Sequence, residues 1–164
     1  MTSQPDSIDA LVIDLGSKDG QVRQQARHEL VAMSTAAIDA LTGTLSGANK
    51  QTRWEAAKAL AGIGAPQVAP GLVTALADEE SDIRWIAAEG LIALDRGGLE
   101  LLLDALARDA ENAGLRKGAH HVLKQLVAGH PEELQPVLQA LESPAAVEET
   151  LVAAASALAK LEGR

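Results

Sequence analysis

Residues 72–91 contain the pattern that decides the fold of this chain. They begin with Leu72-Val-Thr-Ala-Leu76-Ala-Asp78 and, after a short polar stretch, continue as Ile83-Arg84-Trp85-Ile-Ala-Ala-Glu-Gly-Leu91. On both sides of the polar stretch the apolar residues recur every three or four positions, which is the spacing of one face of a helix. The polar residues between the two apolar runs are typical of a loop. The pattern therefore predicts two helices joined by a tight turn.

The second half of this pattern recurs along the chain in phase with an arginine. Four arginines, spaced 30, 31 and 32 positions apart, are each followed by apolar residues at offsets of three, seven and ten. These arginines are Arg23, Arg53, Arg84 and Arg116. A fifth, degenerate copy has Leu151 in place of the arginine, and a shorter apolar pattern precedes every copy. We therefore expect five helical hairpins, approximately over residues 7–34, 35–64, 65–95, 96–128 and 129–164.

These hairpins are expected to stack into a single elongated domain. A hairpin of about 31 residues cannot bury its apolar face alone, so successive hairpins must cover one another. Glycine and proline stand where one unit should end and the next begin, at Gly64-Ala-Pro66, Gly97-Gly98 and Gly129-His-Pro131. The sequence predicts an all-α fold over residues 1–164, a right-handed α-solenoid or armadillo-like superhelix of about five stacked hairpins.

The repeated pattern also resembles a known family. Leu-x-x-x-Leu followed by Val-Arg-x-x-Ala-x-x-x-Leu is similar to the short HEAT repeat of the phycobilisome-lyase type, and residues 72–91 are the best copy of it. In HEAT families the repeat arginine usually pairs with an aspartate that ends the preceding helix. Here only Asp78 stands at that place, so we do not expect a regular ladder of such pairs. We interpret the four arginines as structural residues.

Composition excludes several classes of function. The chain has no cysteine and a formal net charge of −9, so disulfides and thiolate chemistry are absent and a cytoplasmic location is the expectation. The acidic balance argues against nucleic acid and anionic membranes as partners. Residues 1–6 lack the basic start of a secretion signal, and no apolar run approaches the roughly 18 residues that span a bilayer.

Two tryptophans are the only aromatic residues, and both directly follow a repeat arginine in adjacent copies. At about 100° per residue, this position points away from the core and toward the concave face that second helices line in such a solenoid. We expect the two rings to stand within roughly 10 Å of each other. The predicted partner-binding face comprises Trp54, Glu55, Lys58, Trp85, Ile86, Glu89, Lys117 and His121.

Exposed tryptophan is typical of a binding hot spot, and a mixed-charge rim suits a protein or peptide better than a polyanion. The alternative is that both rings lie flat over neighbouring small side chains and fill shallow gaps. The four histidines show no His-x-x-x-His spacing, and no serine lies in a Gly-x-Ser-x-Gly turn. We therefore expect no catalytic residue, metal or cofactor, and a non-enzymatic scaffold or adaptor. The alternative function, which the resemblance implies, is a chromophore-lyase-like or other catalytic subunit.

The C-terminal helix, expected over residues 147–161, carries a different signal. Val152, Ala153 and Ala157 fall on the side where a sixth hairpin would stack, with only Ser156 and Lys160 polar nearby. The ends of a solenoid normally carry polar caps. The sequence therefore predicts a homodimer through this end of the molecule.

Overall fold

The computed structural model describes residues 7–163, and within them the regular secondary structure is all helix, with no strand. The expectations for residues 1–6 lie outside it. The α-helices are α1 (Ile8–Asp14), α2 (Gly20–Ala32), α3 (Ile38–Thr44), α4 (Lys50–Ile63), α5 (Ala69–Leu76), α6 (Ser81–Leu94), α7 (Arg96–Arg108), α8 (Ala113–Leu126), α9 (Pro131–Glu142) and α10 (Ala146–Glu162). Short 3-10 helices, Ser34–Ala37 and Pro66–Val68, precede α3 and α5. This confirms the all-α solenoid.

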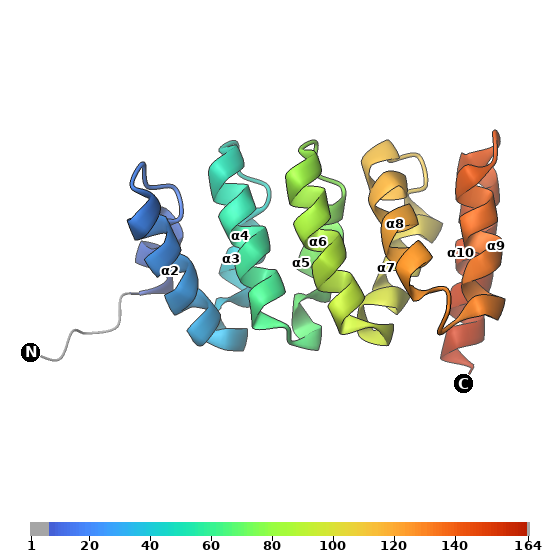
Figure 1. The fold of residues 1–164 in the computed structure, drawn as a ribbon, viewed down its shortest axis with the longest axis horizontal. Coiled ribbons are helices and arrows are strands. Elements are labelled where there is room, and N and C mark those ends of the chain that lie inside the picture. The colour runs from blue at the N-terminus through green and yellow to red at the C-terminus, as the bar shows by residue number, and fades with distance from the viewer. Residues whose placement is uncertain (1–6, 164) are drawn as a thin grey trace, which may run out of the picture.

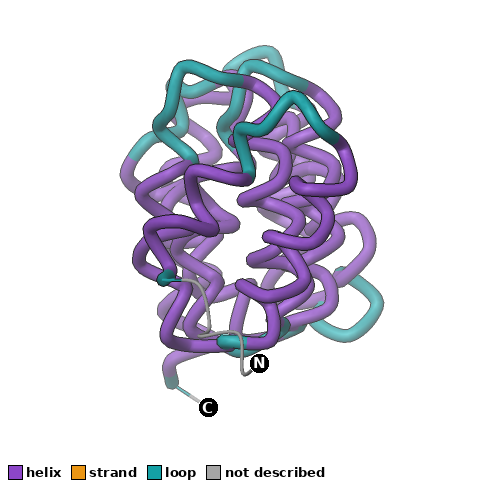
Figure 2. The backbone as a smooth tube through the Cα atoms, turned by 90° about the vertical axis from the view of Figure 1, so that its left-hand side faces the viewer, coloured by secondary structure: helices purple, strands orange, loops and turns teal. Residues whose placement is uncertain are grey.

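The helices form two layers along one axis. In one layer α2, α4, α6 and α8 each pack against the next, and in the other α1, α3, α5 and α7 do the same. Figure 1 shows the first of these layers as a row facing the viewer, and Figure 2, seen along the row, shows both layers edge-on. We call the solvent-facing side of α2, α4, α6 and α8 the second-helix face.

The core is built from leucine, alanine, isoleucine and valine. The residues three and seven positions after each repeat arginine are all buried: Ala26, Leu30, Ala56, Leu60, Ala87, Leu91, Ala119 and Leu123. Those ten positions after it are only half-buried, because they lie near the helix ends. Alanine at the first of these positions lets neighbouring helices approach closely, and leucine at the second fills the space between the layers.

The repeat arginines bind the turn that precedes their own helix. Nη1 of Arg23, Arg53 and Arg84 donates to the carbonyl oxygen six residues upstream at 2.8, 3.1 and 2.7 Å, and Arg116 makes the equivalent bond. These carbonyls lie just beyond the C-terminus of the first helix, where the helix dipole is negative. The interaction offsets the unfavourable position of a cation in the first turn of the second helix.

The last hairpin departs from the expected order. Its first helix, α9, packs against α8, and its second helix, α10, packs against α7, so the two helices exchange layers relative to the four hairpins before them. In Figure 1, α9 continues the front row beyond α8. The fifth copy is therefore a helical hairpin, as expected, but α10 does not line the second-helix face.

The turns between hairpins differ in a way that coincides with this exchange. Each of the first three contains a residue with positive φ, namely Ser34 (53°), Gly64 (62°) and Asp95 (49°), and residues 127–130 contain none. A residue with positive φ at a helix end turns the chain out of the helix, as the left-handed Gly64 does at the end of α4. The first three turns return the chain to the other layer, whereas the fourth leaves α9 in the layer of α8.

The break expected at Gly97-Gly98 lies slightly earlier, at Asp95. Both glycines belong to the first turn of α7. A Cβ atom on Gly98 would lie 2.8 Å from the carbonyl oxygen of Leu91, so this glycine is required by the close approach of α6 and α7. The glycine pair therefore marks a packing contact and not the turn itself.

Candidate partner-binding face

Trp85 is the most exposed large apolar side chain on the second-helix face, with 57% of its surface accessible. It belongs to α6, directly after Arg84, and its ring centroid lies 4.7 Å from that of His121 on α8 at an interplanar angle of 39°. A hollow of about 220 Å³ adjoins the ring and is bounded by Arg84, Lys117 and Gly118 among others. The imidazole of His121 is held from the other side by Glu89, at 3.2 Å.

Trp54 occupies the equivalent position on α4 but has different surroundings. Its ring is half-buried and packs against the core. The guanidinium carbon of Arg27 lies 5.8 Å from the ring centroid, and the amine of Lys58 lies 4.9 Å from it, so both cations interact with the π-system. Trp54 is therefore less exposed than Trp85, because side chains of this chain already cover it.

Glu55 lies inside the molecule, contrary to the expected place on an exposed rim. Only 3% of its surface is accessible. Its carboxylate accepts hydrogen bonds from Arg23 Nε at 3.3 Å, from Arg27, and from Gln51 Nε2 at 3.1 Å. These partners satisfy the hydrogen-bonding capacity of a carboxylate that is shielded from water. Arginine four residues after a repeat arginine occurs only at Arg27, and this was the one sequence signal for the pairing.

The remaining members of the predicted face divide by exposure. Lys58, Glu89 and Lys117 are exposed, His121 is half-buried beside Trp85, and Ile86 packs partly against the core. A second hollow, of about 480 Å³, lies beside Trp54 between α2 and α4 and shares no lining residue with the one beside Trp85. Within residues 7–163 the only ring contact found is that of Trp85 with His121. The structure thus places the tryptophans at two separate hollows.

Positive charge predominates around the hollow at Trp85. Arg84 and Lys117 supply this charge, the imidazole of His121 also lines the hollow, and no carboxylate does. Glu89 lies outside the lining, engaged with His121. The chain as a whole carries −9, whereas the lining of this hollow holds Arg84 and Lys117 and no carboxylate. The arrangement can receive an apolar or aromatic group against the indole with a carboxylate beside it.

The chain matches one known protein family over most of its length. A family model for HEAT repeats matches residues 8–92 and 38–111, which together cover more than half of the sequence. The chain belongs to the HEAT-repeat family. No curated protein matches it.

Two solved structures are similar to this HEAT-repeat chain. One is the complex of CpcE and CpcF of phycocyanin lyase from Nostoc sp. PCC7120, at 24% identity and a TM-score of 0.48, covering 100% of this chain and 68% of that chain. The other is an engineered protein, at 23% identity and a TM-score of 0.41, covering 95% of this chain and 79% of that chain.

Within residues 7–163 no three side chains of histidine, aspartate or glutamate come together as metal ligands would. His120 pairs with Glu142 at 2.8 Å, and His130 lies 3.9 Å from Asp95. The helices of this part of the chain lack the combination of length and apolar character that a membrane crossing requires.

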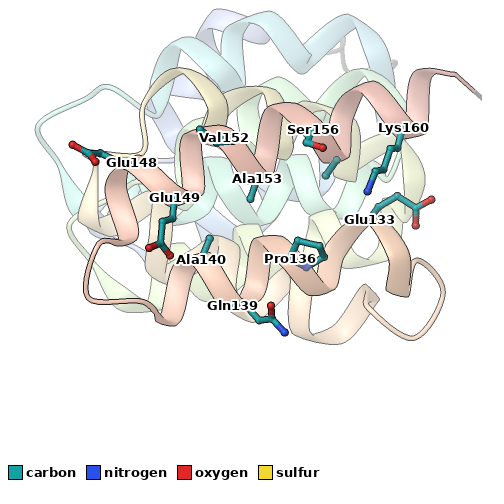
Figure 3. A pocket seen from close by; sticks show the side chains of 11 residues that line it. Glu133, Pro136, Gln139, Ala140, Glu148, Glu149, Val152, Ala153, Ser156 and Lys160 are labelled. Carbon is teal, nitrogen blue, oxygen red and sulfur yellow. The ribbon is translucent and has the colours of Figure 1, made fainter.

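A second surface lies at the C-terminal end of the solenoid, between α9 and α10 (Figure 3). It is a groove of about 590 Å³. Val152 is 73% accessible and Ala153 half-buried on its rim, whereas Ala157 is buried at its base. The sequence pattern identified these residues of α10. It missed Pro136 and Ala140, which α9 contributes, because that contribution depends on how the last hairpin closes.

Proposed function

We propose that this HEAT-repeat protein is a non-enzymatic cytoplasmic adaptor that binds an acidic peptide segment of a partner protein on its second-helix face. The observation that carries the proposal is the exposure of Trp85 above a hollow lined by Arg84, Lys117 and His121. A large rigid apolar side chain next to fixed cations is the usual composition of a binding hot spot.

The size and charge of the hollow define the segment that would fit. A volume of about 220 Å³ accommodates one side chain, not a cofactor. An aliphatic or aromatic side chain would pack on the indole of Trp85, and an adjacent aspartate or glutamate would meet Lys117. Trp54 would contribute less, because Arg27 and Lys58 already occupy its ring faces.

The non-enzymatic character of the proposal follows from the residue types at this site. The lining offers cations, an indole and one hydroxyl group, that of Ser81. His121 is stacked on Trp85 and bonded to Glu89, an arrangement that orients it for recognition. The proposed cytoplasmic location is supported by the absence of cysteine and by the acidic composition.

Peptide display with the folded protein tests this function. A random peptide library displayed on phage would be selected against the wild-type chain, and affinities of the enriched peptides would be measured by fluorescence anisotropy. We expect acidic motifs with one apolar residue, and a loss of affinity of roughly 30-fold in Trp85→Ala, as expected for a hot spot.

Matched variants separate the contribution of Trp85 from a general effect of exposed apolar surface, and the effect of charge from that of shape. Ile13→Ser removes an even more exposed apolar side chain, 75% accessible, from α1, outside the second-helix face, and should bind as wild type. Lys117→Glu should weaken acidic peptides but not their Asn/Gln counterparts. Unchanged affinity in Trp85→Ala, or no enrichment of any motif, would overturn the proposal.

We propose a second role for the C-terminal end of the solenoid, which is self-association through the groove between α9 and α10. The support is the exposed Val152 beside a groove lined largely by small side chains, at an end where a polar cap would be expected.

A further inference from the structure

The residues that α10 presents at the end of the solenoid have an internal symmetry. Of the seven residues of α10 that line the groove in Figure 3, six share it, all but Glu148: Glu149, Val152, Ala153, Ser156, Ala157 and Lys160. They follow the spacing of three and four that forms one helix stripe. Reversing α10 end to end about the point between Ala154 and Ala155 exchanges the first residue with the last, the second with the fifth and the third with the fourth.

We infer from this symmetry that the groove is filled by α10 of a second copy of the chain, with the two α10 helices antiparallel across a twofold axis. This arrangement rests on the self-association proposed above. A twofold interface must be complementary to itself, so that each residue meets the counterpart given by the axis. Here Val152 would face the partner's Ala157, and Ala153 would face the partner's Ser156. Together with α9 of each copy, the helices would form a four-helix arrangement.

Charge selects the antiparallel orientation over the alternatives. With the axis between Ala154 and Ala155, Glu149 faces the partner's Lys160, and the axis makes this pair twice. A parallel arrangement would place glutamate against glutamate and lysine against lysine. Glu133 and Glu148 complete the charged lining, so the end carries more carboxylates than cations.

The acidic excess at the C-terminal end also disfavours a contact in which α10 of one copy stacks on α1 of another. The N-terminal helix α1 carries Asp9 and Asp14 and no cation. A head-to-tail contact between α10 and α1 would therefore bring carboxylates together without a lysine to separate them, and it would continue into a filament instead of closing. The twofold contact closes after two copies.

The side chains of α10 fit close helix packing. Ala153, Ser156 and Ala157 are small, so the two helices can approach to the roughly 8 Å of closely packed pairs. Val152, which is 73% accessible in one copy, would become buried against the partner. Pro136 and Ala140 of α9 would form the far wall of the groove, beside the incoming helix.

Charge exchange tests both the association and its orientation. Sedimentation equilibrium from 5 to 500 μM would be measured for the full chain, for Glu149→Lys, for Lys160→Glu and for the double variant. We expect a dimer for the wild type, at least tenfold weaker association for each single variant, and recovery in the double variant. The equimolar mixture of the two single variants should form a heterodimer, because both charge pairs are then restored.

The outcomes distinguish self-association itself from the antiparallel arrangement of the two α10 helices. A wild type that remains monomeric at 500 μM would overturn self-association altogether. A wild-type dimer whose strength is unchanged in both single variants would overturn the antiparallel arrangement while leaving self-association in place. Val152→Asp should abolish the dimer without loss of helicity by circular dichroism, since the side chain is exposed in a single copy. Trp85→Ala should dimerise as the wild type does, because Trp85 lies on the second-helix face.

Discussion

Asp78 and Arg53 show how single side chains connect successive repeats. Nε of Arg53, on α4, donates to Oδ2 of Asp78 at 2.8 Å, and Nη2 donates to Oδ1 at 3.2 Å. Asp78 also accepts from the backbone amide of Glu80 at 2.9 Å, which shapes the turn before α6. The aspartate side chain therefore pairs with the arginine of the preceding repeat, while Arg84 of its own repeat donates to the backbone carbonyls of Asp78 and Glu79. A bidentate pair of this kind fixes the spacing between neighbouring hairpins.

This pairing makes the stability of the fold depend on acidic pH. Burial raises the pKa of the Asp78 carboxyl, but the hydrogen bonds from Arg53 and Glu80 and the positive charges of Arg53 and Arg84 outweigh it and hold the pKa below its ordinary value. A carboxyl whose pKa is lower in the folded chain stabilises the fold above the unfolded pKa of about 4 and loses that contribution as the pH falls through the folded value.

We therefore predict that the free energy of unfolding declines more steeply below about pH 4 in the wild type than in Asp78→Asn. Urea denaturation at a series of pH values between 2 and 7 measures the difference. Asp82→Asn is the matched control, since Asp82 is exposed, forms an ion pair with the exposed Lys50 and accepts from the amide of Ile83, and it should retain the wild-type slope. Equal slopes in the wild type and Asp78→Asn would contradict the prediction.

The two tryptophans occupy the same position of the repeat but differ in exposure. Periodicity placed both on one face, and both lie on the second-helix face. Their exposure differs because Arg27 reaches Trp54 from α2, whereas the residue that reaches Trp85 is His121 from α8. The periodicity of one helix does not specify which side chain of a neighbouring helix will cover a given residue.

At the scale of the helices, the turns between hairpins carry the strain in this fold. Asp95 adopts φ 49° and ψ −123°, a conformation that suits glycine and that other residues rarely adopt. The chain tolerates it because the turn must bring α7 back to the layer of α5, where it packs. The side chain of Asp95 is exposed and lies 3.9 Å from His130, so it contributes little to compensate.

Asp95→Gly should consequently stabilise the protein. Relief of backbone strain is worth about 1 to 3 kcal/mol, and the added freedom of glycine in the unfolded chain costs about 0.4 to 1 kcal/mol. We expect a net gain of roughly 1 kcal/mol in the free energy of unfolding, measured by urea denaturation.

Asp95→Ala separates the backbone from the side chain in this experiment. It removes the same carboxylate but keeps a Cβ atom, so it should give no gain. A stabilisation of equal size in both variants would show that the carboxylate, and not the backbone, is unfavourable at this position.

For the whole molecule, a stack of hairpins distributes stability unevenly. Each interior hairpin is covered on both sides, whereas an end hairpin has one neighbour. The N-terminal hairpin also contributes less buried apolar surface than the C-terminal one, because its first helix, α1, has seven residues and buries only Leu11. At the other end, α10 has 17 residues and packs against both α7 and α9.

Hydrogen exchange followed by mass spectrometry should reveal this asymmetry. We predict that amides of α1 exchange at least tenfold faster than those of α6, because local opening of an end hairpin exposes less apolar surface. Amides of α10 should be protected nearly as well as those of α6, which controls for a simple effect of chain ends. Protection of α1 equal to that of α6 would contradict the prediction.

The sequence by itself determined the repeat, the all-α class and the buried positions. These features depend on the periodicity within one helix. That periodicity is visible in the sequence as the spacing of apolar residues around each repeat arginine. Alanine and leucine three and seven positions after the arginine are buried in all four copies for this reason.

Only the tertiary structure decided the rest. The exchange of layers by α9 and α10, the burial of Glu55 between two arginines and the separate hollows at Trp54 and Trp85 all arise from contacts between segments. Such contacts depend on the conformation of a few turn residues and on which neighbouring side chain reaches across. The physical reason is that helical periodicity fixes the direction of a side chain relative to its own helix, whereas packing fixes what stands in that direction.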